Sequence, residues 1–219
     1  MSITTELPAT DSDFRWRAYA LIGGGVLFAI GNALHPLRHS EESEQAATWV
    51  AAHVSFSAGA VLMAAGLPLV TAAWHSLGRP SIARLAAVTR ALLYAGLAVA
   101  IPIGGYHEAF VAPRLSHHEQ HAIETAAMPV NGPLAACFLV GFLLLAGCAF
   151  AAPNTLLARP AAAVLVVSVL VMGAAEGLPG AEGLWIIPGT IAVGLVVAFA
   201  GVRALRDTDA STPRAAMSS

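Results

Sequence analysis

The sequence predicts an all-α integral membrane protein, a bundle of six transmembrane helices with both termini in the cytoplasm. The composition is one reason: 57% of the 219 residues are hydrophobic and only 11% are charged, whereas soluble domains carry about 25% charged residues. The distribution of the arginines along the chain is the other reason. With six spans, nine of the eleven basic residues, all of them arginine, fall on one side. Short loops rich in arginine stay in the cytoplasm.

The length leaves room for one transmembrane domain, because six spans of about 20 residues use more than half of the chain. We expect this domain over 15–206, with disordered cytoplasmic tails at 1–14 and 207–219 that are rich in Ser, Thr, Asp and Ala. The lipid bilayer is the expected partner, and the net charge of -2 argues against nucleic acid. The expected spans lie at about 18–34, 49–74, 85–106, 133–152, 161–176 and 184–205.

The first two spans carry different packing signals. Four glycines lie in the first span, Gly23, Gly24, Gly25 and Gly31, before His35-Pro36 ends it. Because glycine lets helices approach closely, such faces favour a homo-oligomer or a partner subunit. Tryptophans stand at both ends of the second span, Trp49 and Trp74, and we expect them in the aromatic belts at the two membrane surfaces.

The later spans contain the irregular features. Pro102 and Gly104-Gly105 near the outer end of the third span predict a kink or an unwound segment beside a cavity. Ser116 with Glu119 has the form of a capping box, which predicts a short helix at 117–127 on the outer surface. The fifth span begins near Ala161, so Glu176 is expected to lie still within the outer leaflet.

Polar side chains from four spans are expected at similar depth near the outer surface, where they would form one pocket. Its expected members are Asn32, His35, His53, Ser57, Tyr106, His107, Glu108 and Glu176. Convergent polar groups in an apolar bundle are typical of a ligand site. Their predicted roles are catalysis for Tyr106, Glu108 and Glu176, cofactor or metal binding for His35, His53 and His107, and substrate contact for Asn32 and Ser57.

Each of these residues also has a purely structural interpretation. His35 could simply end a helix at the membrane surface, and His53 could simply make a buried hydrogen bond. His107 and Glu108 could form an exposed pair without a ligand, and Glu176 could lie in a solvated turn. The histidines of the longest outer connection, between the third and fourth spans, are expected on a solvated helix face: His117, His118 and His121.

The pocket residues suggest several cofactors. Three imidazoles and a carboxylate suit zinc, copper or non-haem iron, and two facing imidazoles suit a b-type haem. Comparison with the motifs of known membrane protein families does not select one of these cofactors. Fatty-acid desaturases carry several cytoplasmic histidine boxes, whereas this chain has one, HHEQH, on the outer side. Ceramidase-type hydrolases need histidines in the last span, and retinal proteins need a lysine; this chain has neither.

Two short patterns, His35-Pro36 after the first span and W-x-x-x-H from Trp49 to His53, resemble those of small membrane proteins of GC-rich bacteria. This resemblance implies a bacterial plasma membrane and no particular function. Three functions stay open: a metal- or haem-dependent oxidoreductase; a cofactor-free acid–base enzyme (cyclase, isomerase or hydrolase) acting on an apolar lipid-like or isoprenoid substrate; and a transporter or accessory subunit of a membrane complex.

Overall fold

The computed structural model describes residues 11–38, 40–154, 156–180 and 183–211, and all regular elements in these ranges are helices. They are α1 (Asp11–Leu34), α2 (Glu41–Glu44), α3 (Ala47–His75), α4 (Pro80–Tyr94), η1 (Ala95–Ala100), α5 (Ile101–Tyr106), η2 (His107–Val111), η3 (Ala112–Arg114), α6 (His117–Ala151), α7 (Arg159–Ala174), η4 (Ala175–Gly177) and α8 (Gly183–Ser211). Both α1 and α8 extend into the segments predicted as tails. The outermost residues, 1–10 and 212–219, lie outside the described ranges.

Five helical stretches are long and apolar enough to cross a membrane, in agreement with the predicted class of protein. They are Ser12–Leu34, Ala47–His75, Pro80–Arg114, His118–Ala151 and Gly183–Asp207. The predicted fifth span corresponds to α7, which has 16 residues and is shorter than these five. The fold is therefore that of a multi-pass helical membrane protein.

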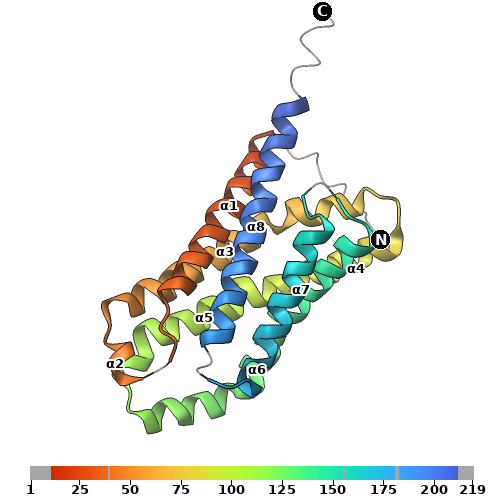
Figure 1. Ribbon diagram of the computed structural model, residues 1–219. Coiled ribbons are helices and arrows are strands. Elements are labelled where there is room, and N and C mark those ends of the chain that lie inside the picture. Colours follow the sequence, from red (N-terminus) through yellow and green to blue (C-terminus); the bar gives the residue numbers. More distant parts are fainter. Residues whose placement is uncertain (1–10, 39, 155, 181–182, 212–219) are drawn as a thin grey trace, which may run out of the picture.

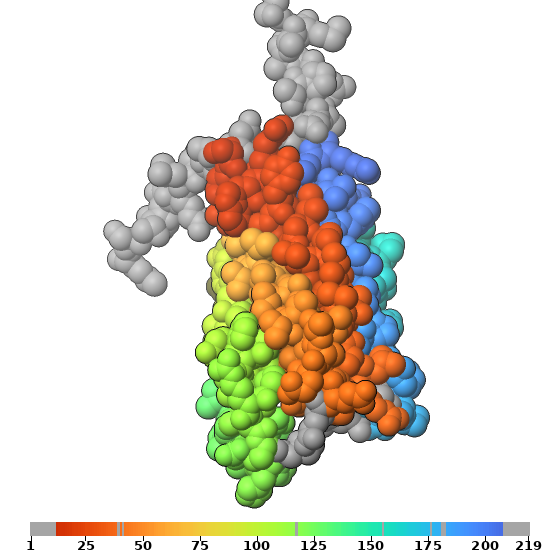
Figure 2. Space-filling model, turned by 90° about the vertical axis from the view of Figure 1, so that its left-hand side faces the viewer, coloured from red at the N-terminus to blue at the C-terminus, as the bar shows by residue number. Residues whose placement is uncertain are grey.

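The helices form an elongated bundle in which α1 packs against both α3 and α8 (Figure 1). The start of α1 and the end of α8 lie side by side at one end of the bundle, which we call the terminal end (Figures 1 and 2). The end of α1 and the start of α3 lie at the opposite end, which we call the histidine end because His35 and His53 are there.

Glycines bring the backbones of α1, α3 and α8 into direct contact. A Cβ added at Gly24 of α1 would lie 2.6 Å from the Met63 amide nitrogen and 2.8 Å from the Gly59 carbonyl oxygen of α3. A Cβ added at Gly194 of α8 would lie 2.6 Å from the Gly25 carbonyl oxygen. No real Cβ fits at such distances, so these positions accept only glycine unless the helices separate.

The two tryptophans of α3 are buried and join helices, while their place in the aromatic belts stays a prediction. Trp49 and Trp74 are both fully buried. The Trp49 indole donates a hydrogen bond of 2.6 Å to the Glu108 carbonyl oxygen, and the Trp74 indole donates one of 2.7 Å to the Ala152 carbonyl oxygen. Each end of α3 is thereby fixed to a neighbouring helical segment. A buried indole N–H needs such an acceptor.

The third span is one continuous helical run from Pro80 to Arg114 with two π-helical segments, η1 and η2. The sequence predicted a kink or an unwound segment near Pro102. Proline has no N–H and its ring clashes with the carbonyl four residues earlier. The π-helical turn of η1, which ends at Ala100, accommodates this clash without breaking the helix.

The capping box at Ser116 is confirmed, but the helix that it starts is longer than predicted. The Glu119 amide donates to Ser116 Oγ (3.4 Å), and the Glu119 carboxylate accepts from the Ser116 amide (2.8 Å). The helix α6 then continues to Ala151, through Pro129 and Pro133, instead of ending near 127. Its first part still lies across the histidine end of the bundle (green in Figure 1).

Replacing Gly24 with Ala should destabilise the protein by about 1–3 kcal/mol, because the new methyl group would overlap the α3 backbone. The matched control is Gly23→Ala, since a Cβ at Gly23 meets nothing within 4 Å. Thermal unfolding of the two purified variants in the same detergent measures the difference. Equal melting temperatures would contradict the proposed role of the close packing.

Candidate functional site

The histidine end contains a cluster of four aromatic side chains formed by His35, Trp49, His53 and Phe56. His35 directly follows α1, while Trp49, His53 and Phe56 lie on one face of α3 at helical spacing. The ring centroids of His35 and His53 are 4.9 Å apart, and the His53 ring lies 4.3 Å from that of Trp49 and 5.1 Å from that of Phe56. His53 is 1% exposed, which confirms its predicted burial.

Backbone carbonyls determine which ring nitrogen carries the hydrogen in both histidines of this cluster. His53 Nδ1 lies 2.8 Å from the Trp49 carbonyl oxygen, and His35 Nδ1 lies 2.9 Å from the Pro36 carbonyl oxygen. Because a carbonyl oxygen only accepts, Nδ1 carries the hydrogen in each ring. In the neutral ring the second nitrogen, Nε2, then carries no hydrogen.

His107 and Glu108 form a second polar group next to this cluster. His107 Nδ1 lies 3.1 Å from Glu108 Oε1, and each side chain is about a quarter exposed (24% and 25%). The Glu108 carbonyl accepts the Trp49 indole hydrogen bond, which links the pair to α3. Among the described residues, His107 Nε2 is buried and has no hydrogen-bond partner.

The other predicted site residues are spread over the bundle. Ser57 Oγ lies 3.5 Å from the Ile101 carbonyl oxygen, where α3 packs against the third span. Tyr106 is 63% exposed and its ring contacts Phe110 at 5.5 Å, outside the aromatic cluster. The backbone of Glu176 lies in the 3-10 turn η4, directly after α7. Its side chain, like all of Glu182, lies outside what the structure describes.

A cavity of about 550 Å³ lies beside the cluster, between six helical segments. Its apolar wall includes Phe28, Phe56, Phe138 and Met172, and its polar lining consists of Asn32, Asn131 and Thr190. Phe56 belongs to both the cavity and the aromatic cluster. Asn32, which is 8% exposed, is the predicted pocket residue that lines this cavity.

Two cavity residues were missed from the sequence. Asn131 lies between Pro129 and Pro133, in a stretch that was assigned to a connection and is helical in the structure. Thr190 lies inside α8, where a hydroxyl in an apolar run was the available signal. Its Oγ1 lies 2.9 Å from the Ile187 carbonyl oxygen, so the hydroxyl is satisfied within its own helix.

The metal and haem interpretations find no support in this geometry. Among the described residues, no group of three or more His, Cys, Asp or Glu side chains is arranged to hold a metal ion, so the predicted His35, His53 and His107 ligand set is not formed. Axial histidines stand on opposite faces of a haem. The rings of His35 and His53 contact each other edge to face at 4.9 Å, which leaves no space for a macrocycle between them.

Replacing His53 with Ala should lower the stability by about 2–4 kcal/mol, because it empties a fully buried site and removes the bond to the Trp49 carbonyl. His75→Ala on the same helix is the control, since His75 is exposed. Chemical unfolding followed by tryptophan fluorescence measures both. A similar stability for the two variants would show that the cluster contributes little to the fold.

No protein-family model, curated protein or solved structure matches this chain. The bacterial plasma membrane therefore stays a prediction from sequence. The functional proposal rests on the chain's own cavities and polar side chains.

Proposed function

We propose that this protein binds an uncharged, largely apolar small molecule in the 550 Å³ cavity at the histidine end. The cavity carries this proposal because its volume falls within the range of about 300–1,000 Å³ that ligand pockets occupy. Its wall is mostly aromatic and aliphatic, with a few amide and hydroxyl groups. Such a pocket within a helical bundle is suited to molecules that enter from the lipid phase.

The polar groups of the cavity favour a ligand with a neutral polar head. Asn32 donates one amide hydrogen from Nδ2 to the Phe28 carbonyl (2.8 Å), so its second amide hydrogen and its acceptor Oδ1 can serve a neutral polar group. Thr190 uses its hydroxyl hydrogen within α8, so its oxygen also acts as an acceptor. The residues that line the cavity are uncharged. An isoprenoid-like alcohol, which presents one O–H donor on an apolar chain, matches these features.

The proposed topology has six spans, with α7 as the fifth span and the terminal end in the cytoplasm. The arginine distribution supports this orientation. The helix α7 has 16 residues, and the 3-10 turn η4 extends it by three. Together their 19 residues fall within the length of about 17–25 residues that a span needs.

A second candidate function is acid–base catalysis on the bound molecule, favoured by the contact between His35 and His53 next to the cavity. Both rings pack on Phe56, which is part of the cavity wall. If the Phe56 side chain moved out of the wall, the cavity would open toward the two imidazoles, one of which would act as a general base and then as an acid. The predicted catalytic roles of Glu108, Tyr106 and Glu176 remain part of this hypothesis.

Filling the cavity should abolish ligand binding. Ala135→Trp places an indole in the cavity, while Ala136→Trp on the next position of α6 is the control, because Ala136 does not line it. Photocrosslinking with a diazirine analogue of farnesol in lipid nanodiscs should label the wild type and Ala136→Trp strongly and Ala135→Trp only weakly. Equal labelling of all three proteins would exclude the cavity as the binding site.

Positions 116 and 211 should be labelled from opposite sides of the membrane if the six-span topology holds. Single cysteines at Ser116 and Ser211, in a background where Cys137 and Cys148 are Ala, would be treated with an impermeant maleimide in intact cells. We expect labelling at 116 and protection at 211 until the cells are opened. Labelling of both positions in intact cells would contradict the topology.

If the histidine pair catalyses proton transfer, deuterium from D₂O should enter the carbon positions next to the carbonyl of a bound isoprenoid ketone such as geranylacetone, because a general base can remove those hydrogens. His53→Gln should stop this exchange but keep photocrosslinking, since it alters the imidazole and leaves the cavity wall in place. Mass spectrometry of the extracted ketone measures the exchange. Deuterium uptake that is equal in His53→Gln and the wild type would exclude His53 as the proton-transfer group.

A further inference from the structure

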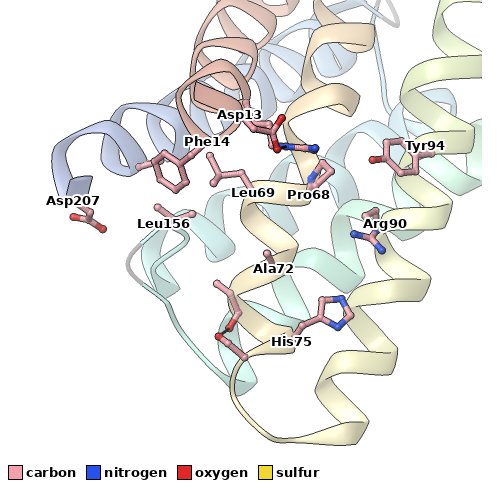
Figure 3. Close-up of a pocket in the computed structure, with 14 residues that line it drawn as sticks. Asp13, Phe14, Pro68, Leu69, Ala72, His75, Arg90, Tyr94, Leu156 and Asp207 are labelled. Carbon is pink, nitrogen blue, oxygen red and sulfur yellow. Dashed lines mark hydrogen bonds and ion pairs between the residues drawn. The ribbon is translucent and has the colours of Figure 1, made fainter. Parts of the chain in front are cut away.

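A second and larger cavity, of about 1,370 Å³, lies at the terminal end, on the opposite side of the bundle core from the proposed ligand cavity. It is bounded by the first turns of α1, the last turns of α3, the first half of the third span and the end of α8 (Figure 3). One part of its wall is apolar, with Phe14, Pro68, Leu69 and Leu156. Another part carries arginine, tyrosine and histidine side chains.

Arg90 is the unusual member of this wall. The sequence predicts it five residues after the start of the third span at 85, and the structure places it within α4, ten residues after Pro80. At 1.5 Å per residue it lies about 15 Å along the helix from that end. Ionisable side chains at such depth in an apolar span are unfavourable unless they face water or a partner, and they commonly mark a functional site.

The side chains around Arg90 suit an anion. Tyr94, one turn further along α4, shares its face and adds a hydroxyl donor. Figure 3 shows Arg90 and Tyr94 extending from α4 and His75 lying near them at the end of α3. Asp207, in contrast, lies on the opposite side of the cavity, at the end of α8. The charges in this cavity are therefore separated, and the Arg90 side of it is cationic.

The second arginine of the cavity differs from Arg90 because it has a carboxylate partner. Arg17 Nε lies 3.1 Å from Asp13 Oδ2 on the same helix. Among the described residues, the structure shows no carboxylate paired with Arg90. An anionic head group attached to an apolar chain would suit this cavity. The head group would pair with the Arg90 guanidinium, and the chain would pack against the apolar wall beside it. Guanidinium groups bind phosphate through two parallel hydrogen bonds.

We infer that the terminal-end cavity binds a phosphate-bearing molecule, with Arg90 as the ligand of the phosphate and the Phe14–Leu69–Leu156 wall as the site of its apolar part. A phospholipid of the bilayer is the source that the apolar wall favours. Free phosphate or a soluble phosphate ester shares the same head-group chemistry. The site is independent of the cavity at the histidine end, because the residues that line the two cavities are different.

The test compares four proteins: the wild type, Arg90→Ala, Arg90→Lys and Arg84→Ala. Arg84 is the matched control, because it is an exposed arginine on the same helix and does not line the cavity. Each full-length protein in neutral detergent is titrated with short-chain phosphatidylglycerol, with the diacylglycerol of the same chain length, and with inorganic phosphate. Thermal unfolding and native mass spectrometry report the melting shift and the bound molecules.

We expect phosphatidylglycerol to raise the melting temperature of the wild type and of Arg84→Ala and to appear as a bound adduct. Arg90→Ala should lose both effects, and Arg90→Lys should retain part of them. If inorganic phosphate alone gives the Arg90-dependent shift in melting temperature, Arg90 binds phosphate as inferred, and the ligand is a soluble phosphate compound instead of a phospholipid. Should Arg90→Ala fail to fold, Arg90→Gln serves for the same comparison.

Two results would overturn the inference. One is an equal shift with diacylglycerol, since the phosphate would then not be recognised. The other is an unchanged phosphatidylglycerol shift in the Arg90 variants that fold, since Arg90 would then not be its ligand.

Discussion

The close contact of α1 with α3 and α8 is the constraint on which the other features of this protein depend. In lipid the hydrophobic effect does not hold helices together, so association relies on close packing. Pairs of glycines seven residues apart line the contacts: Gly24 and Gly31, Gly59 and Gly66, and Gly194 and Gly201. The spacing of seven keeps each pair on one helix face. This packing leaves α3 only one position along α1, and α3 carries His53 and both buried tryptophans.

The position of α3 determines where the polar groups meet. With α3 fixed against α1, His35 at the end of α1 comes into contact with His53, and the Trp49 indole reaches the Glu108 carbonyl. Gly105 completes the arrangement, because an added Cβ there would overlap Ser57 Oγ and lie 3.1 Å from the His53 carbonyl oxygen. The cluster is thus held by backbone contact and aromatic packing.

The class of the fold could be predicted because composition, span length and arginine distribution all depend on the membrane itself. Burial of His53 could also be predicted, since it lies within an apolar span. The hydrogen-bond partners of each polar group could not be predicted from the sequence. Trp49 and Trp74 resembled interface residues because their spacing matched the bilayer, and only the packed structure shows that their indoles reach carbonyls of other segments. Likewise, the sequence predicted Arg90 inside the third span, but only the structure shows that it lines a cavity with Tyr94 and His75.

The two cavities are separated by the most tightly packed part of the bundle. Along α3, Met63 lies between Phe56 of one cavity and Pro68 of the other, and along the third span Leu97 lies between Ala100 and Tyr94. Met63 and Leu97 are fully buried, as is Phe142 of α6 in the same core. This buried layer separates the two cavities. The two proposed binding sites are therefore distinct, and the ligand proposed for one neither requires nor excludes the ligand proposed for the other.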